Sequence, residues 1–181
     1  MKWLAAAITL ALAGCVTAAP NSVIRLAPGE AMTVRVNENS GQILSAEKSA
    51  AQPPSEMLQA IARAASAGLL GDASGPNYAP VYGGANTQLP PPGVVRVTLV
   101  MLPTRQTILY VENGYDQQLS YAAALEGGPR PGPTDVCTVR PHSFGVEQWP
   151  YLIDHIDLSA LKLSPWRDGD QIVCAPPPRQ T

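Results

Sequence analysis

The runs VVRVTLVML at residues 94–102 and TILYV at residues 107–111 decide the fold class of this chain. Both are rich in β-branched and apolar residues, which is typical of strands buried in a sheet. Asn113-Gly114 follows the second run and is a strong short-range hairpin signal. Beyond it, polar and apolar positions alternate, with one apolar face formed by Tyr115, Leu119, Tyr121, Ala123 and Leu125. The pattern predicts a further, half-buried strand.

Short strands continue toward the C-terminus, separated by turn residues. A Gly/Pro-rich loop at 127–133 precedes a predicted strand at 134–139, and Asp168-Gly169 turns the chain into another at 171–174. Between them a bulged strand is predicted from its apolar residues, Ile153, Ile156, Leu158, Leu161 and Leu163. Short strands at turn-punctuated intervals favour an antiparallel β-sandwich.

The N-terminal half contains a predicted hairpin and one predicted helix. Residues 31–36 alternate apolar and polar, Asn39-Ser40-Gly41 forms a turn, and residues 42–46 return. Ser55 then suits a helix N-cap and Gly71 a C-cap. The helix carries an apolar stripe of Leu58, Ile61, Ala62, Ala65 and Leu69. We expect this stripe to pack on a sheet of the same domain; the alternative is a face that binds a partner or a membrane surface. The predicted fold class is mainly β, an antiparallel sandwich-like domain with one N-terminal amphipathic helix.

The first residues read as a targeting segment. Lys2 precedes a short apolar run that ends in Leu12-Ala13-Gly14-Cys15. The arrangement resembles the type II signal peptides of bacterial lipoproteins, which implies cleavage after Gly14 and lipidation of the Cys15 thiol. A membrane-spanning helix needs about 20 apolar residues, and residues 3–16 provide only 14. Cleavage after Ala19 in a plain secreted protein would leave Pro20 behind the cut, and a buried core helix would leave Lys2 without a role.

Two further expectations follow from resemblance. In enterobacterial lipoproteins an Asp after the lipidated Cys retains the protein in the inner membrane, so Val16 favours the outer membrane, on its periplasmic face. A block of about 80 residues is also similar to uncharacterised proteobacterial lipoproteins, with which no activity is associated. It is carried by Val136-Cys137-Thr138-Val139-Arg140-Pro141, Trp149-Pro150 and Ile156-Asp157-Leu158-Ser159.

These observations divide the chain into segments. We predict a signal peptide at 1–14, a lipidated tether at 15–22, a hairpin and helix region at 23–71, a Pro/Gly-rich linker at 72–93, a β-sandwich-like domain at 94–176 and a tail at 177–181. The 19 prolines among 181 residues cluster in such connecting stretches.

Charge and cysteine content limit the function classes. With 12 Lys+Arg against 14 Asp+Glu, the chain has no electrostatic footprint for nucleic acid. The membrane contact would therefore come from the lipid. If Cys15 is lipidated, Cys137 and Cys174 remain as an even pair, most simply a disulfide in an oxidising periplasm. Free buried thiols or metal ligands are the alternatives.

Motifs for catalysis are missing from the sequence. It has no Gly-x-Ser-x-Gly elbow, no phosphate-binding glycine loop and no His-Glu-x-x-His helix. We therefore expect an envelope protein that acts as a binding or structural subunit, without a cofactor, rather than an enzyme. The alternative function is metal binding through His142 and His155, together with Asp157. Aromatic residues mark candidate partner-binding surfaces at Trp149, Tyr151, Tyr78 and Tyr82, although Trp149 and Tyr151 also suit the core of a sandwich.

Overall fold

The computed structural model describes residues 23–52 and 90–175, and these residues contain strands but no helix. The predicted signal peptide, tether, helix, C-terminal tail and most of the 72–93 linker lie outside the described residues. No helix in the described part is long and apolar enough to cross a membrane. The strands are β1 (Ile24–Leu26), β2 (Glu30–Val36), β3 (Ile43–Ala50), β4 (Val95–Met101), β5 (Thr107–Asn113), β6 (Gln118–Glu126), β7 (Gly132–Thr134), β8 (Val136–Cys137), β9 (Ser143–Trp149), β10 (His155–Ser164) and β11 (Cys174–Ala175).

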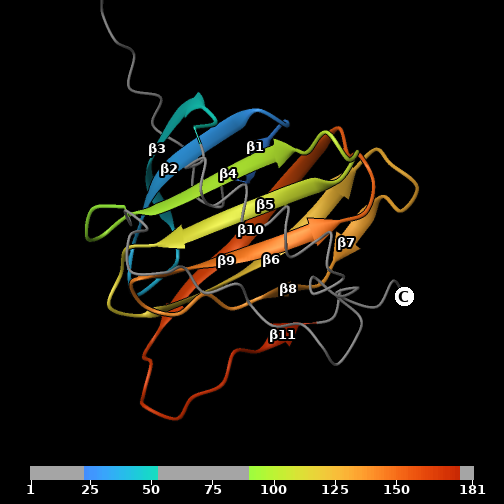
Figure 1. Ribbon diagram of the computed structural model, residues 1–181. Coiled ribbons are helices and arrows are strands. Elements are labelled where there is room, and N and C mark those ends of the chain that lie inside the picture. Colours follow the sequence, from blue (N-terminus) through green and yellow to red (C-terminus); the bar gives the residue numbers. More distant parts are fainter. Residues whose placement is uncertain (1–22, 53–89, 176–181) are drawn as a thin grey trace, which may run out of the picture.

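Two antiparallel sheets face each other, which confirms the predicted sandwich-like class. One sheet has the order β3-β2-β4-β5-β9, and the other has the order β1-β10-β6-β7. In Figure 1 the first sheet lies in front of the second, so β4, β5 and β9 pass over β6 and β10. A short pair, β11-β8, extends from one side of the sandwich.

The core lies between the two sheets because alternate residues of each strand point inward. Val95, Val97 and Leu99 of β4 enter it from one side, and Ile156 and Leu158 of β10 enter it from the other; all five are at most 2% exposed. Strand β10 carries the predicted irregularity, since its register with β6 shifts between Ser159 and Lys162 and Ala160 has a φ of 51°. This bulge keeps Leu161 and Leu163 in the core after the shift.

A second apolar cluster lies on the opposite, outer face of the five-stranded sheet. Its members are almost fully buried and come from β4, β5, β9 and the residue after β4: Val100, Leu102, Ile108, Tyr110, Phe144 and Val146. Ala51, which follows β3, packs against it. We call this set the outer cluster. As a result, every residue of β5 is buried, which explains the apolar run from Ile108 to Val111 on both of its faces.

The hairpin predicted at Asn113-Gly114 is wrong. Strand β5 pairs with β4 and β9, whereas β6 belongs to the other sheet, so the chain crosses between sheets here. The Asn113 side chain fixes this corner by donating to the carbonyls of Gln117 and Arg140 and by accepting the Tyr115 N–H. Gly114 packs against the backbone of residues 90–94, where a Cβ would lie only 2.5 Å from the Pro91 oxygen. The dipeptide therefore serves close packing at a corner.

The 72–93 linker does not separate two folded units. Strand β2 pairs with β4, and β1 pairs with β10, so the N-terminal strands belong to the same sandwich as the C-terminal ones. The predicted return strand at 42–46 is longer in the structure, where β3 reaches Ala50. Hydrophobic patterning identified these strands but carried no information on their partners in space.

Strand β9 is not among the strands predicted from the sequence. Its inward face carries Gly145, Glu147 and Trp149, and this mixture hides the alternation that marks a strand. Glu147 is 2% exposed, and its Oε1 accepts the Cys137 N–H at 2.7 Å. The strand predicted at 134–139 is in turn broken into β7 and β8, and the one predicted at 171–174 is reduced to β11.

Candidate functional site

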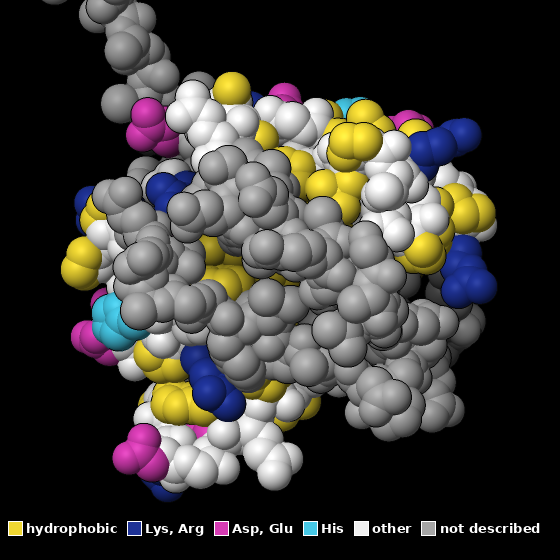
Figure 2. Space-filling model, in the orientation of Figure 1, with side chains coloured by type: hydrophobic (Ala, Val, Ile, Leu, Met, Phe, Trp, Pro, Cys, Tyr) yellow, Lys and Arg dark blue, Asp and Glu magenta, His cyan; other side chains and the backbone are white. Residues whose placement is uncertain are grey.

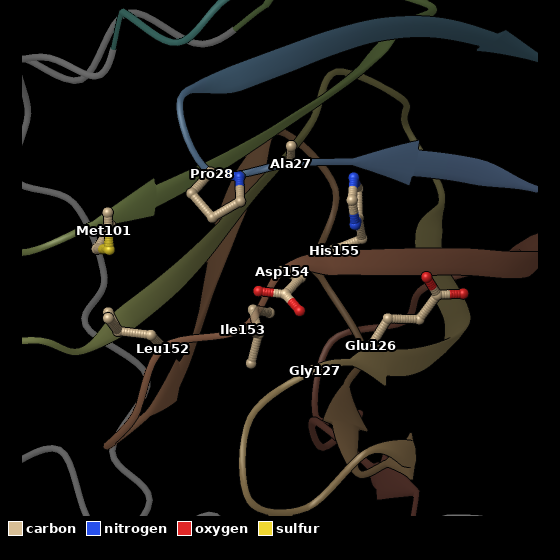
Figure 3. Close-up of a pocket in the computed structure, with 9 residues that line it drawn as sticks. All are labelled: Ala27, Pro28, Met101, Glu126, Gly127, Leu152, Ile153, Asp154 and His155. Atoms are coloured by element: carbon tan, nitrogen blue, oxygen red, sulfur yellow. The ribbon is translucent and has the colours of Figure 1, made fainter.

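A shallow cleft of about 710 Å³ lies at the end of the sandwich where β6 ends and β10 begins. Five apolar residues and three ionisable ones, with one glycine, line it (Figure 3): Ala27, Pro28, Met101, Leu152, Ile153, Glu126, Asp154, His155 and Gly127. Met101 is the last residue of the core strand β4 yet is 53% exposed, which makes it one of the exposed large apolar side chains of the described residues. Apolar surface with a few polar groups at its margin is the usual composition of a binding site.

The loop after β6 gives the cleft its shape. Gly127 has a φ of +75°, and a Cβ at this position would overlap the Asp154 carboxylate. Gly128 has a φ of +73°, and a Cβ there would lie 2.7 Å from the Leu152 oxygen. The Asp154 N–H donates to the Glu126 carbonyl at 2.8 Å and fastens the two sides together. The two glycines therefore allow the chain before β10 to approach β6 closely.

Charged side chains border the cleft on the outer face of the four-stranded sheet. Arg25 lies directly opposite Asp157 in the β1–β10 register and donates to both of its carboxylate oxygens, at 2.7 and 2.6 Å. The same guanidinium pairs with Glu126. These hydrogen bonds from Arg25 hold the pKa of Asp157 below its usual value. His155 lies two residues before Asp157 on β10, opposite Glu126 in the β10–β6 register.

Glu30, the first residue of β2, holds the segment between β1 and β2 that lines the cleft. Its Oε2 accepts the Ala27 N–H at 2.8 Å and pairs with Lys48 at 2.7 Å. The Ala27 N–H is the main cause of the lowered pKa of Glu30, and Lys48 adds to it. The backbone of Ala27 and Pro28, which forms one wall of the cleft, is thereby fixed to β2.

The chemistry of the cleft suits binding. Among the described residues that line it there is no Ser, Thr, Cys or Lys to serve as a nucleophile. Within residues 23–52 and 90–175, no group of three or more His, Cys, Asp and Glu side chains is arranged to hold a metal ion. The three ionisable groups can orient a ligand through hydrogen bonds, and the apolar wall can remove part of it from water.

The structure separates the two histidines of the metal-binding alternative. His155 and Asp157 lie two residues apart on β10, beside Arg25. His142 lies at the far end of the sandwich, where its backbone N–H donates to the Tyr115 carbonyl and its ring contacts Asp116. His155 and His142 are therefore at opposite ends of β6.

The structure confirms the predicted cysteine pair but buries one of the aromatic residues predicted to lie on a binding surface. Cys137 and Cys174 form a disulfide with an S–S distance of 2.07 Å, joining β8 to β11. Trp149 is 5% exposed in the main core, where its Nε1 donates to Thr134 Oγ1, so it is not a surface residue. Tyr151 is half-buried against the same core, and Tyr78, Tyr82 and Cys15 lie outside the described residues.

Sequence reasoning missed the cleft itself. Its lining comes from four separate parts of the chain, and His155 is the only lining residue that the sequence indicated as a candidate ligand. The one hint was Gly127-Gly128, which marked a loop without indicating what it packs against.

Comparison with known proteins adds no relationship to this picture: no family model, no curated protein and no solved structure matches the chain.

Proposed function

We propose that this chain is a lipid-anchored protein of the bacterial cell envelope whose sandwich domain is a binding module. The observation that carries the proposal is the Cys137–Cys174 disulfide. It fits an oxidising compartment. Because the sequence has three cysteines, it also leaves Cys15 as the only unpaired thiol, in the Leu12-Ala13-Gly14-Cys15 box. A lipid at this position would anchor the domain at the periplasmic face of the outer membrane.

The cleft at Met101, Asp154 and His155 is the binding surface that we propose. It combines an exposed apolar side chain with carboxylates and an imidazole in one hollow. Metal binding has weaker support, because His142 and His155 are far apart. An envelope partner with an apolar segment next to a polar or cationic group would match the cleft.

Site-specific photo-crosslinking in intact cells tests the cleft. A benzophenone amino acid replaces Met101 in one variant and Leu44 in the matched control. The two side chains are similarly exposed, 53% and 56%, but lie at opposite ends of the five-stranded sheet. We expect a discrete adduct from position 101 that position 44 does not give.

A second substitution makes the result specific. Asp154→Ala should weaken the position 101 adduct, whereas Asp168→Ala, which removes an exposed carboxylate in the turn before β11, should leave it unchanged. If the adduct forms equally at positions 101 and 44, or if its yield at position 101 is unchanged by Asp154→Ala, the cleft is not the binding surface.

A further inference from the structure

The outer cluster is buried, although none of the strands within residues 23–52 and 90–175 packs on it. Its residues are at most 8% exposed, with Ile108 at 0% and Tyr110 at 2%. The partner sheet covers the other face of β4, β5 and β9, and of the described residues Ala51 is the apolar neighbour packed on the outer cluster. Figure 2, drawn from the outer side, shows only a small part of these hydrophobic side chains. A sandwich of two layers would leave such a face in water.

A segment of the same chain is the natural candidate for covering this face, because the connection from β3 to β4 has to cross the sheet. Three segments lie outside the described residues: 1–22, 53–89 and 176–181. The last has six residues, too few to cover several strands. Most of the first is the predicted signal peptide, and under this prediction it is absent from the mature protein. Residues 53–89 remain.

The topology requires a crossover connection between β3 and β4. Strands β3 and β4 both pair antiparallel to β2, so they are parallel to each other, and a crossover must join them. The chain leaves β3 at Ala50, level with Leu99 near the end of β4, and must return to Val95 at its start. Since the inner face is filled by the other sheet, the outer face is the available route.

The predicted helix has the length and the face for this task. Seven residues of β4 span about 23 Å, and a helix over 56–70 would span about 22 Å. Its stripe of Leu58, Ile61, Ala62, Ala65 and Leu69 offers small and branched apolar side chains on one side. Ala51, immediately before the segment, already contacts the outer cluster.

We propose that residues 55–70 form an amphipathic helix whose apolar stripe docks on the outer cluster, adding a third layer to the sandwich. A helix docked there would explain why the outer cluster is buried and how the chain crosses from β3 to β4. It would also explain why one side of the helix is apolar. It also means that the stripe is not free to bind a partner or a membrane surface.

Thiol labelling of the full mature chain tests the docking. The protein is expressed without residues 1–14 and carries Cys15→Ser so that a single introduced thiol is free, and Val146→Cys places that thiol in the outer cluster. We expect it to react with a maleimide about tenfold or more slowly than a Leu44→Cys thiol on the exposed edge. Leu58→Asp with Ile61→Asp should remove most of this protection. Gln59→Asp with Ser66→Asp, off the stripe, should preserve it.

Two controls keep the result decisive. A Val111→Cys thiol in the main core should stay protected in every variant, which shows that the sandwich remains folded. Independently, a short bismaleimide should join Ile61→Cys to Val146→Cys within one chain. The proposal would be overturned if the Val146→Cys thiol is labelled rapidly without further substitutions, or if it stays protected when Leu58 and Ile61 are replaced by Asp. A cross-link formed only between two chains would also overturn it.

Discussion

The Tyr115 hydroxyl holds both backbone groups of Val36: it accepts the Val36 N–H at 2.8 Å and donates to the Val36 carbonyl at 3.1 Å. Tyr115 follows the corner at Asn113-Gly114, and Val36 ends β2, so this pair fastens the crossing between sheets to the N-terminal strands. Both residues are at most 5% exposed.

Removing this hydroxyl should destabilise the domain. Tyr115→Phe leaves two buried backbone groups without their partner, and the expected cost is about 1–3 kcal/mol. Tyr110→Phe is the matched control, because its hydroxyl is buried without a hydrogen-bond partner among the described residues. Chemical denaturation of the two variants should show a clear loss for Tyr115→Phe and little or no loss for Tyr110→Phe. Equal effects would contradict the assigned role of Tyr115.

The corner itself can be tested at Gly114. A Cβ there would lie 2.5 Å from the Pro91 oxygen and 2.9 Å from the Val94 oxygen, and backbone atoms cannot easily move aside. Gly114→Ala should therefore lower the unfolding temperature more than Gly145→Ala, whose Cβ would meet only the Val139 side chain at 3.0 Å. If Gly114 lay instead in a solvent-exposed hairpin turn, Gly114→Ala would be no more destabilising than Gly145→Ala. That result would contradict the packed corner.

The disulfide should contribute strongly to stability. Cys174→Ala removes a cross-link between residues 37 apart, and the expected loss is about 4 kcal/mol on the chain-entropy model. Thermal unfolding of the oxidised and reduced sandwich domain provides the same comparison without mutation. Two free thiols in protein isolated from cells with its thiols trapped would contradict the assignment.

Acid should weaken the Arg25–Asp157 pair. The folded-state pKa of Asp157 is lowered from its usual 3.8 by Arg25, so its contribution is present above that value and is lost as the pH falls through the folded pKa. Unfolding measured between neutral pH and about pH 2 should show a smaller acid-induced loss for Asp157→Asn than for the unmodified protein. Asp168→Asn is the control and should follow the unmodified curve. An unchanged slope in Asp157→Asn would refute the linkage.

The sequence revealed much of the strand content but little of the pairing. Alternation in β2 and β6 and the apolar run of β4 identified these strands, since each follows a local period that burial imposes. The hairpin predicted at Asn113-Gly114 was wrong because a glycine in a turn and a glycine at a tightly packed corner look alike in sequence. Strand β9 escaped because Gly145 and the buried Glu147 occupy its inner face. The cleft escaped because its lining is assembled by long-range pairing.

The N-terminus of the mature protein provides the most direct test of the central claim. Mass spectrometry of the protein extracted from membranes would identify its first residue and any modification. We predict a chain that begins at Cys15 and carries diacylglycerol on the thiol, and a Cys15→Ser variant that no longer enters the membrane fraction as a processed protein. A membrane-bound chain that starts elsewhere, or that carries a free Cys15 thiol, would contradict the account.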